Sequence, residues 1–149
     1  MKWLYRHLHR NEKGFTLVEL MIVIVILGIL TGIAIPSYMA LRNRARVAAA
    51  KAELMNIATV LWIFEADNEG YPDGTFAELA TALEAPPAYM DLVPLKDDWG
   101  TLYTYKPQGA VLAPGLYSEY MIYSCGPDMK DDGGQVGTDD IVVINGQLQ

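Results

Sequence analysis

Residues 15–35 read FTLVELMIVIVILGILTGIAI, an almost purely apolar run that decides how the rest of the chain is organised. About 20 apolar residues are enough to cross a bilayer as a helix, so the run predicts a membrane-spanning segment. The basic residues before it favour a cytoplasmic amino terminus, although Arg42, Arg44 and Arg46 follow closely and weaken that argument. An ordinary secretory signal is the alternative, but its apolar core is shorter and ends in a small-residue cleavage site.

Beyond Pro36 the helical pattern continues with a different surface. Apolar residues recur there at steps of three and four, the spacing of an amphipathic helix, at Val47, Ala50, Leu54, Ile57, Leu61 and Phe64. One helix is therefore expected from about residue 15 to 67, interrupted and kinked at Pro36, which removes a backbone donor. Gly70 is expected to take the left-handed cap, and Pro72 cannot continue the helix.

The remaining residues predict a small α+β unit. Thr75 followed by Glu78 is a capping box, which predicts a short helix over residues 75–83. Alternating β-branched, aromatic and polar residues predict strands, and the stretch before the last of them is rich in Asp and Gly. The expected strands are residues 102–106, 119–124 and 141–144, and the loop of residues 126–140 is called the Asp/Gly loop below.

The expected fold is α+β, with a long amino-terminal helix packed on a small carboxy-terminal antiparallel sheet. The uniformly apolar half of the helix must contact lipid or other copies of itself, and the striped half packs on the globular domain. The predicted division is a basic leader at residues 1–14, a membrane helix at 15–36, an amphipathic helix at 37–70 and a globular domain at 71–149.

Charge is distributed unevenly along the chain, whose formal net charge is −7. From Glu53 to Gln149 there are 3 basic and 16 acidic side chains, a formal charge of −13. So acidic a domain repels phosphate backbones, which argues against nucleic acid as a partner. The single cysteine, Cys125, excludes an intrachain disulfide and a thiolate metal cluster.

The segment Lys13-Gly14-Phe15-Thr16-Leu17-Val18-Glu19 joins the leader to the apolar run. Gly14 has no side chain, so a protease can approach the backbone closely. Glu19 places a carboxylate early in an apolar span, where a charge is costly and usually has a partner. A location of Glu19 at the headgroup interface is the alternative.

This segment resembles the processing site of the type IV pilin superfamily. The resemblance implies that a membrane-bound prepilin peptidase cuts between Gly14 and Phe15 and methylates the new amino terminus. It also implies that Glu19 pairs with the amino terminus of a neighbouring subunit, which would fix the axial register of a helical filament.

Two later segments narrow the resemblance to the major pseudopilins of type II secretion, the G-type subunits. Residues 96–105, KDDWGTLYTY, look like their D-P-W-G-x-P-Y-x-Y segment, with Asp98 and Leu102 in place of prolines. Residues 123–128, YSCGPD, and the later run Asp139-Asp140-Ile141 resemble their calcium-binding loop.

Calcium binds hard oxygens from carboxylates and carbonyls, and the Asp/Gly loop offers both. By the resemblance, the ligands would be the carboxylates of Asp128, Asp139 and Asp140 with the carbonyls of Cys125 and Gly137. A solvated Asp/Gly turn without an ion is the other interpretation.

The loop also departs from the family pattern. Met129 stands where the family has glycine, and the stretch before Asp139 is long enough to make Asp131 or Asp132 an alternative ligand.

No catalytic set is visible, since both histidines, His7 and His9, lie in the leader. The predicted function is therefore a structural subunit, not an enzyme. It would form the periplasmic filament that drives protein export through the outer membrane. Its partners would be other copies, the peptidase, minor pseudopilins, an inner-membrane assembly platform and, before assembly, the bilayer. A major pilin of an extracellular pilus and a membrane-anchored periplasmic binding protein are the alternatives.

Overall fold

The structure is a computed structural model that describes residues 14–149, so the predicted leader lies outside the described residues except for Gly14. The chain divides into two compact units, one ending at Ala40 and the other spanning Leu41–Gln149. The domain boundaries expected at residues 14, 36 and 70 stay predictions.

The long helix α1 spans Leu17–Asn68 and is unbroken, so the interruption expected near Pro36 is wrong. A single proline removes only its own backbone donor, and the bonds on either side hold the helix together. Ser37 supports the same turn, because its hydroxyl donates to the carbonyl of Ile33 at 3.2 Å. A kink at Pro36 stays a prediction.

In the second unit α1 buries the predicted stripe, and Ala50, Leu54, Ile57 and Leu61 are all at most 1% exposed. The helix ends differently from the expectation. Glu69, not Gly70, has the positive φ of 62°. Gly70 is instead needed for close packing, because a Cβ there would lie 3.0 Å from the Cβ of Leu116.

The short helix α2 spans Phe76–Glu84, which confirms the predicted helix. The carboxylate of Glu78 accepts the backbone N–H of Thr75 at 2.7 Å and its hydroxyl at 2.9 Å. The capping box read from the sequence is therefore present, and it fixes where α2 begins.

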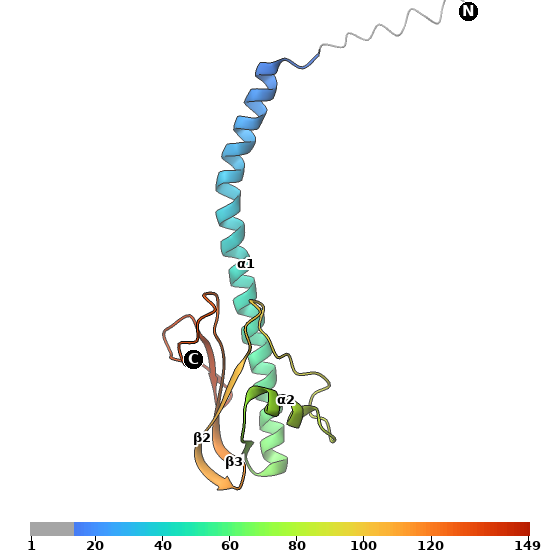
Figure 1. The fold of residues 1–149 in the computed structure, drawn as a ribbon, viewed down its shortest axis with the longest axis vertical. Helices are drawn as coiled ribbons and strands as arrows, with labels where there is room; N and C mark the ends of the chain where they lie inside the picture. Colours follow the sequence, from blue (N-terminus) through green and yellow to red (C-terminus); the bar gives the residue numbers. More distant parts are fainter. Residues whose placement is uncertain (1–13) are drawn as a thin grey trace, which may run out of the picture. The chain divides into compact units, whose positions relative to one another are not determined.

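The five strands form one antiparallel sheet around a central strand, β3 (Figure 1). Strand β2 pairs with one edge of β3. On the other edge, β1 pairs with β3 at residues 116–117 and β4 pairs with it at residues 121–124. Strand β5 then pairs with β4. The bounds are β1 Tyr71–Pro72, β2 Thr104–Ala113, β3 Leu116–Ser124, β4 Ile141–Ile144 and β5 Gln147–Leu148.

The core lies where the carboxy half of α1 meets α2 and the sheet, as Figure 1 shows. Tyrosines fill much of it: Tyr71 and Tyr120 meet edge to face with ring centroids 4.6 Å apart, and Tyr105 stacks near Tyr120. The expected α+β arrangement of a long helix on a small antiparallel sheet is confirmed.

Candidate functional site

The predicted cleavage bond lies in a non-helical segment just before α1 begins at Leu17. Gly14 is exposed, and a Cβ added there would meet nothing within 4 Å. Phe15 is 77% exposed. A peptide bond in this open setting is accessible to a protease.

Glu19 has a role that the sequence analysis missed. Its carboxylate accepts the backbone N–H of Thr16 at 2.8 Å and the Thr16 hydroxyl at 2.9 Å, while the Glu19 N–H donates back to that hydroxyl at 3.2 Å. This is a second capping box, and the T-x-x-E spacing that predicted the one at Thr75 is also present here. Within one chain, Glu19 therefore stabilises the start of α1.

The first half of α1 offers an apolar surface with nothing of its own chain against it. Within the described residues α1 is the one helix long and apolar enough to cross a membrane, and none of its most apolar window is buried. The hydroxyl of Thr31 has a hydrogen-bond partner within the helix, because it donates to the carbonyl of Leu27 at 2.7 Å. Such a surface suits lipid or other apolar helices.

The buried carboxylate of Asp97, 6% exposed, organises the turn before β2. Its Oδ1 accepts the N–H groups of Trp99 at 3.0 Å and Thr101 at 2.9 Å, and its Oδ2 accepts the hydroxyls of Thr101 and, at 2.6 Å, Ser124. Ser124 in turn accepts the N–H of Gly126 at 3.1 Å. Asp97 thereby links this turn to the start of the Asp/Gly loop.

We expect Asp97→Ala to lower the free energy of unfolding by about 3 kcal/mol, because it leaves several buried donors without an acceptor. Urea denaturation of the unit Leu41–Gln149 measures the change. Asp98→Ala, at the exposed neighbouring position, is the matched control and should change stability by less than about 0.5 kcal/mol. Equal effects of the two substitutions would contradict the role given to Asp97.

The Asp/Gly loop places the predicted calcium ligands in different settings. Asp128 is exposed and forms an ion pair with Lys130 at 3.1 Å. Hydrogen bonds from the Lys130 backbone and side chain lower the pKa of Asp128. The carboxylate of Asp139 accepts the N–H of Asp128 at 3.1 Å, so these two residues are adjacent.

Asp140 is the most constrained of the predicted ligands. Its Oδ2 accepts the N–H of Gly134 at 2.9 Å, while its Oδ1 is buried with no hydrogen-bond partner. Burial raises the pKa of Asp140, and the hydrogen bond from Gly134 lowers it. The negative charges of Asp132, Asp131 and Asp139 raise it further. An orphaned carboxylate oxygen among other acids is a setting that a bound cation would relieve.

The two predicted carbonyl ligands lie at opposite ends of the loop. Cys125 is buried at the end of β3, where burial raises the pKa of its thiol, and Gly137 lies in an exposed turn with φ 99°. Gly126, next to Cys125, packs directly on the carbonyl of Asp139, so only glycine fits there.

Across residues 14–149 no three acidic, His or Cys side chains converge into a ready-made metal cluster. The structure brings Asp139 beside Asp128, but the Asp128 carboxylate contacts Lys130. Asp131 accepts the Tyr123 hydroxyl at 2.9 Å and the Gly133 N–H at 2.8 Å.

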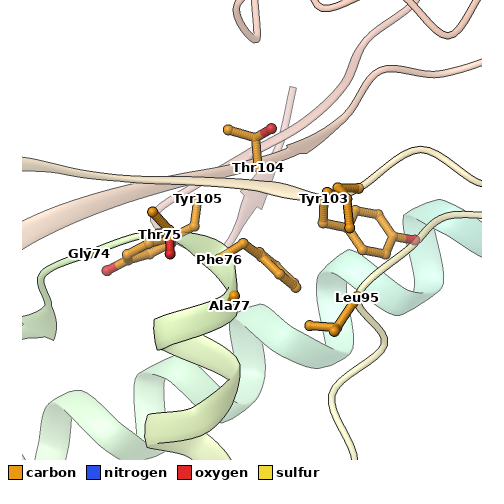
Figure 2. Close-up of a pocket in the computed structure, with 9 residues that line it drawn as sticks. Gly74, Thr75, Phe76, Ala77, Leu95, Tyr103, Thr104 and Tyr105 are labelled. Carbon is orange, nitrogen blue, oxygen red and sulfur yellow. The ribbon is translucent and has the colours of Figure 1, made fainter.

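An apolar pocket of about 340 Å³ lies between the start of α2 and the start of β2 (Figure 2). Phe76, Leu95 and Tyr103 line it, and the ring centroids of Phe76 and Tyr103 are 5.6 Å apart. The hydroxyl of Tyr103 is engaged by Glu53 at 2.6 Å, and no Asp, Glu, His or Cys lines the pocket.

Comparison with known proteins matches both units of the chain. Residues 9–35 match the prokaryotic N-terminal methylation motif, and residues 37–144 match the model of type II secretion system protein G. No solved structure matches the chain significantly.

Several curated relatives carry the same name, type II secretion system core protein G. The protein from Pseudomonas aeruginosa is 34% identical over 87% of this chain and 94% of its own length. Those from Aeromonas hydrophila and Escherichia coli K12 are 33% and 31% identical, over 88% and 87% of this chain and 90% and 88% of their own lengths. With a family model matching residues 37–144 and a methylation motif before it, the chain belongs to the type II secretion system protein G family.

Proposed function

We propose that this chain is the major pseudopilin of a type II secretion system, a structural subunit without catalytic activity. The observation that carries the proposal is the exposed, uniformly apolar half of α1, joined to a domain that matches the protein G family. An isolated chain must keep that surface in lipid, whereas an assembled one can bury it against other copies. The family match favours this filament over an extracellular pilus or a binding protein.

In this proposal the chain starts in the inner membrane, with α1 crossing once and the domain of residues 41–149 in the periplasm. A prepilin peptidase cuts between Gly14 and Phe15 and methylates Phe15. Subunits then leave the bilayer through an assembly platform, together with minor pseudopilins, and form a short periplasmic filament. Growth of that filament pushes folded proteins through the outer membrane.

Processing gives the direct test of the first step. In membranes that contain the peptidase, mass spectrometry should find a chain that begins at N-methylated Phe15. Gly14→Val, which places a branched side chain at the cleavage position, should leave the leader attached. Removal of the leader at any other bond, or normal cutting of Gly14→Val, would contradict the proposed site.

We also propose that the Asp/Gly loop binds Ca²⁺, with Asp140 at its centre. Supporting observations are the orphaned Oδ1 of Asp140 and the negative charges of Asp131, Asp132 and Asp139, which together with burial raise the pKa of Asp140. Asp128 would become a calcium ligand only after the ion pair between its carboxylate and Lys130 breaks. The ion would supply a positive charge that offsets carboxylate repulsion and orders a glycine-rich loop.

A further inference from the structure

Two adjoining hollows form a groove beside helix α2. The first is the apolar pocket of about 340 Å³ at the start of α2 (Figure 2), and the second, of about 460 Å³, continues along the rest of the helix. Ala77 and Leu95 line both hollows, so the two adjoin at these residues. The combined hollow is called the α2 groove below.

Three exposed leucines surround the α2 groove. Leu92 lines the second hollow, Leu102 lines the first and Leu95 lines both. They are 74%, 46% and 61% exposed at Leu92, Leu95 and Leu102 respectively. Apolar side chains gathered in this way, rather than scattered singly, are typical of a surface that contacts another molecule.

The polar atoms of the tyrosines in the first hollow are engaged elsewhere. The hydroxyl of Tyr103 donates to the carboxylate of Glu53, and the hydroxyl of Tyr105 donates to the carbonyl of Pro72, both at 2.6 Å. What these tyrosines offer to the groove is therefore their rings, which suit an apolar side chain.

The outer face of α2 forms the wall shared by the groove. Ala77, Thr81 and Glu84 follow one another at steps of four and three residues, which places them on one side of the helix. The hydroxyl of Thr81 donates to the carbonyl of Ala77 at 2.9 Å, so it needs no outside partner. Side chains this small let a second helix approach to about 8–10 Å.

The end of α2 adds a negative charge to this face. One carboxylate oxygen of Glu84 accepts the N–H of Val93 at 2.7 Å, and the side chain is exposed. The last turn of α2, all of it within the described residues, holds no basic side chain to offset the negative end of the helix. Residues 74–105, which line the groove, carry five acidic and one basic side chain, a formal charge of −4. A cation on the partner is favoured here.

We propose that the α2 groove docks a cationic amphipathic helix of another protein. The apolar face of that helix packs on Ala77 and Leu95 and places one side chain in the first hollow, while a Lys or Arg side chain meets Glu84. Residues 76 and 84 at the ends of α2 are about 12 Å apart along its axis. The apolar anchor and the cation of the partner are therefore separated by about two helical turns, the helix-in-groove mode of recognition.

Two other occupants match fewer of these features. An acyl chain would fill the first hollow but would leave Glu84 without a cation. The globular domain of a second copy is repelled, because residues 53–149 carry a formal charge of −13.

A designed peptide tests the docking on the full chain, held in nanodiscs of uncharged phosphatidylcholine. The probe is an alanine-based helix of about 18 residues, with leucines along one face and lysines flanking them. Fluorescence anisotropy, with binding to empty nanodiscs subtracted, should show saturable binding that weakens as salt is raised. A matched peptide with glutamates in place of the lysines should bind at least about tenfold more weakly.

Variants of the chain place the peptide in the groove. Ala77→Trp fills the point where the hollows adjoin and should weaken binding at least about tenfold, whereas Ala66→Trp, at an exposed position of α1, should not change it. Glu84→Gln keeps an acceptor for the Val93 N–H but removes the charge, so binding should weaken by about threefold. Glu119→Gln, an exposed acid outside the groove, is its control.

Circular dichroism of Ala77→Trp should match that of the unaltered chain, and this variant should still assemble filaments. Equal binding of the lysine and glutamate peptides, or normal binding to Ala77→Trp, overturns the proposal. Loss of filament assembly in a folded Ala77→Trp chain gives the groove to a second copy and also overturns it. Docking of the peptide does not depend on filament assembly, so the proposal stands or falls separately from the proposed function.

Discussion

Glu19→Ala is expected to abolish filament assembly while the chain still inserts in the membrane. Removing a charge from an apolar span makes insertion easier. In the proposed filament the carboxylate neutralises the amino terminus of Phe15 in a neighbouring subunit. Leaving that cation unpaired in an apolar core costs about 4 kcal/mol, roughly a thousandfold in each subunit contact. Membrane fractionation and electron microscopy of sheared filaments measure the two effects.

The capping box makes a sharper experiment possible, because Glu19 has a partner within its own chain. Glu19→Gln keeps a side chain that can accept the Thr16 N–H but removes the charge. We expect it to fail as Glu19→Ala does. Thr16→Val removes the reciprocal hydroxyl but keeps the carboxylate, so it should assemble. Assembly of Glu19→Gln together with failure of Thr16→Val would show that capping, and not charge pairing, is what Glu19 contributes.

The parts of the fold that sequence predicts are those specified by local signals. The stripe through Leu54 and Leu61 is a helical periodicity, and the box at Thr75 and Glu78 marks a helix start, so both were predictable. The strand at residues 141–144 is bounded by turn residues and was predicted with its observed limits.

The β2–β3 hairpin was only partly predictable, because much of it is exposed. Strand β2 was expected to end at residue 106 but continues to Ala113. Its outer half contains Gly109 and lies on the surface, so no burial alternation marks it. Pairing with Leu116 and Tyr117 at the start of β3 holds this half in the sheet.

In the candidate calcium loop, the sequence predicted the residues of the site but not how their side chains are arranged. Residue types identified Asp128, Asp139 and Asp140, but side-chain direction in a loop depends on local hydrogen bonds. Lys130 follows Asp128 by two residues and binds its carboxylate, which the family pattern does not reveal. The buried oxygen of Asp140 likewise depends on the fold around Gly134.

Calcium should raise the melting temperature of the unit Leu41–Gln149, and a chelator should lower it. An ion at 100 times its dissociation constant contributes about 2.7 kcal/mol. For a domain of this size that is a shift of about 10 °C. Asp140→Asn should abolish the response. Asp128→Asn should reduce it only if Asp128 leaves Lys130 to bind the ion, so this second variant defines the ligand set.

The stability of the domain should also depend on pH, in opposite directions with and without calcium. Without calcium, the pKa of Asp140 in the folded domain is raised above the unfolded pKa of about 3.9. The folded domain therefore keeps Asp140 protonated at pH values where the unfolded chain has lost that proton. Ionised Asp140 therefore destabilises the ion-free domain at neutral pH, and this penalty disappears as pH falls through the folded pKa. In chelator, Asp140→Asn should melt above the unaltered domain at pH 7 and level with it below about pH 4. With calcium at pH 7 the order should reverse, since only the unaltered domain gains the ion. Identical melting curves with calcium and with chelator would exclude the ion from this loop.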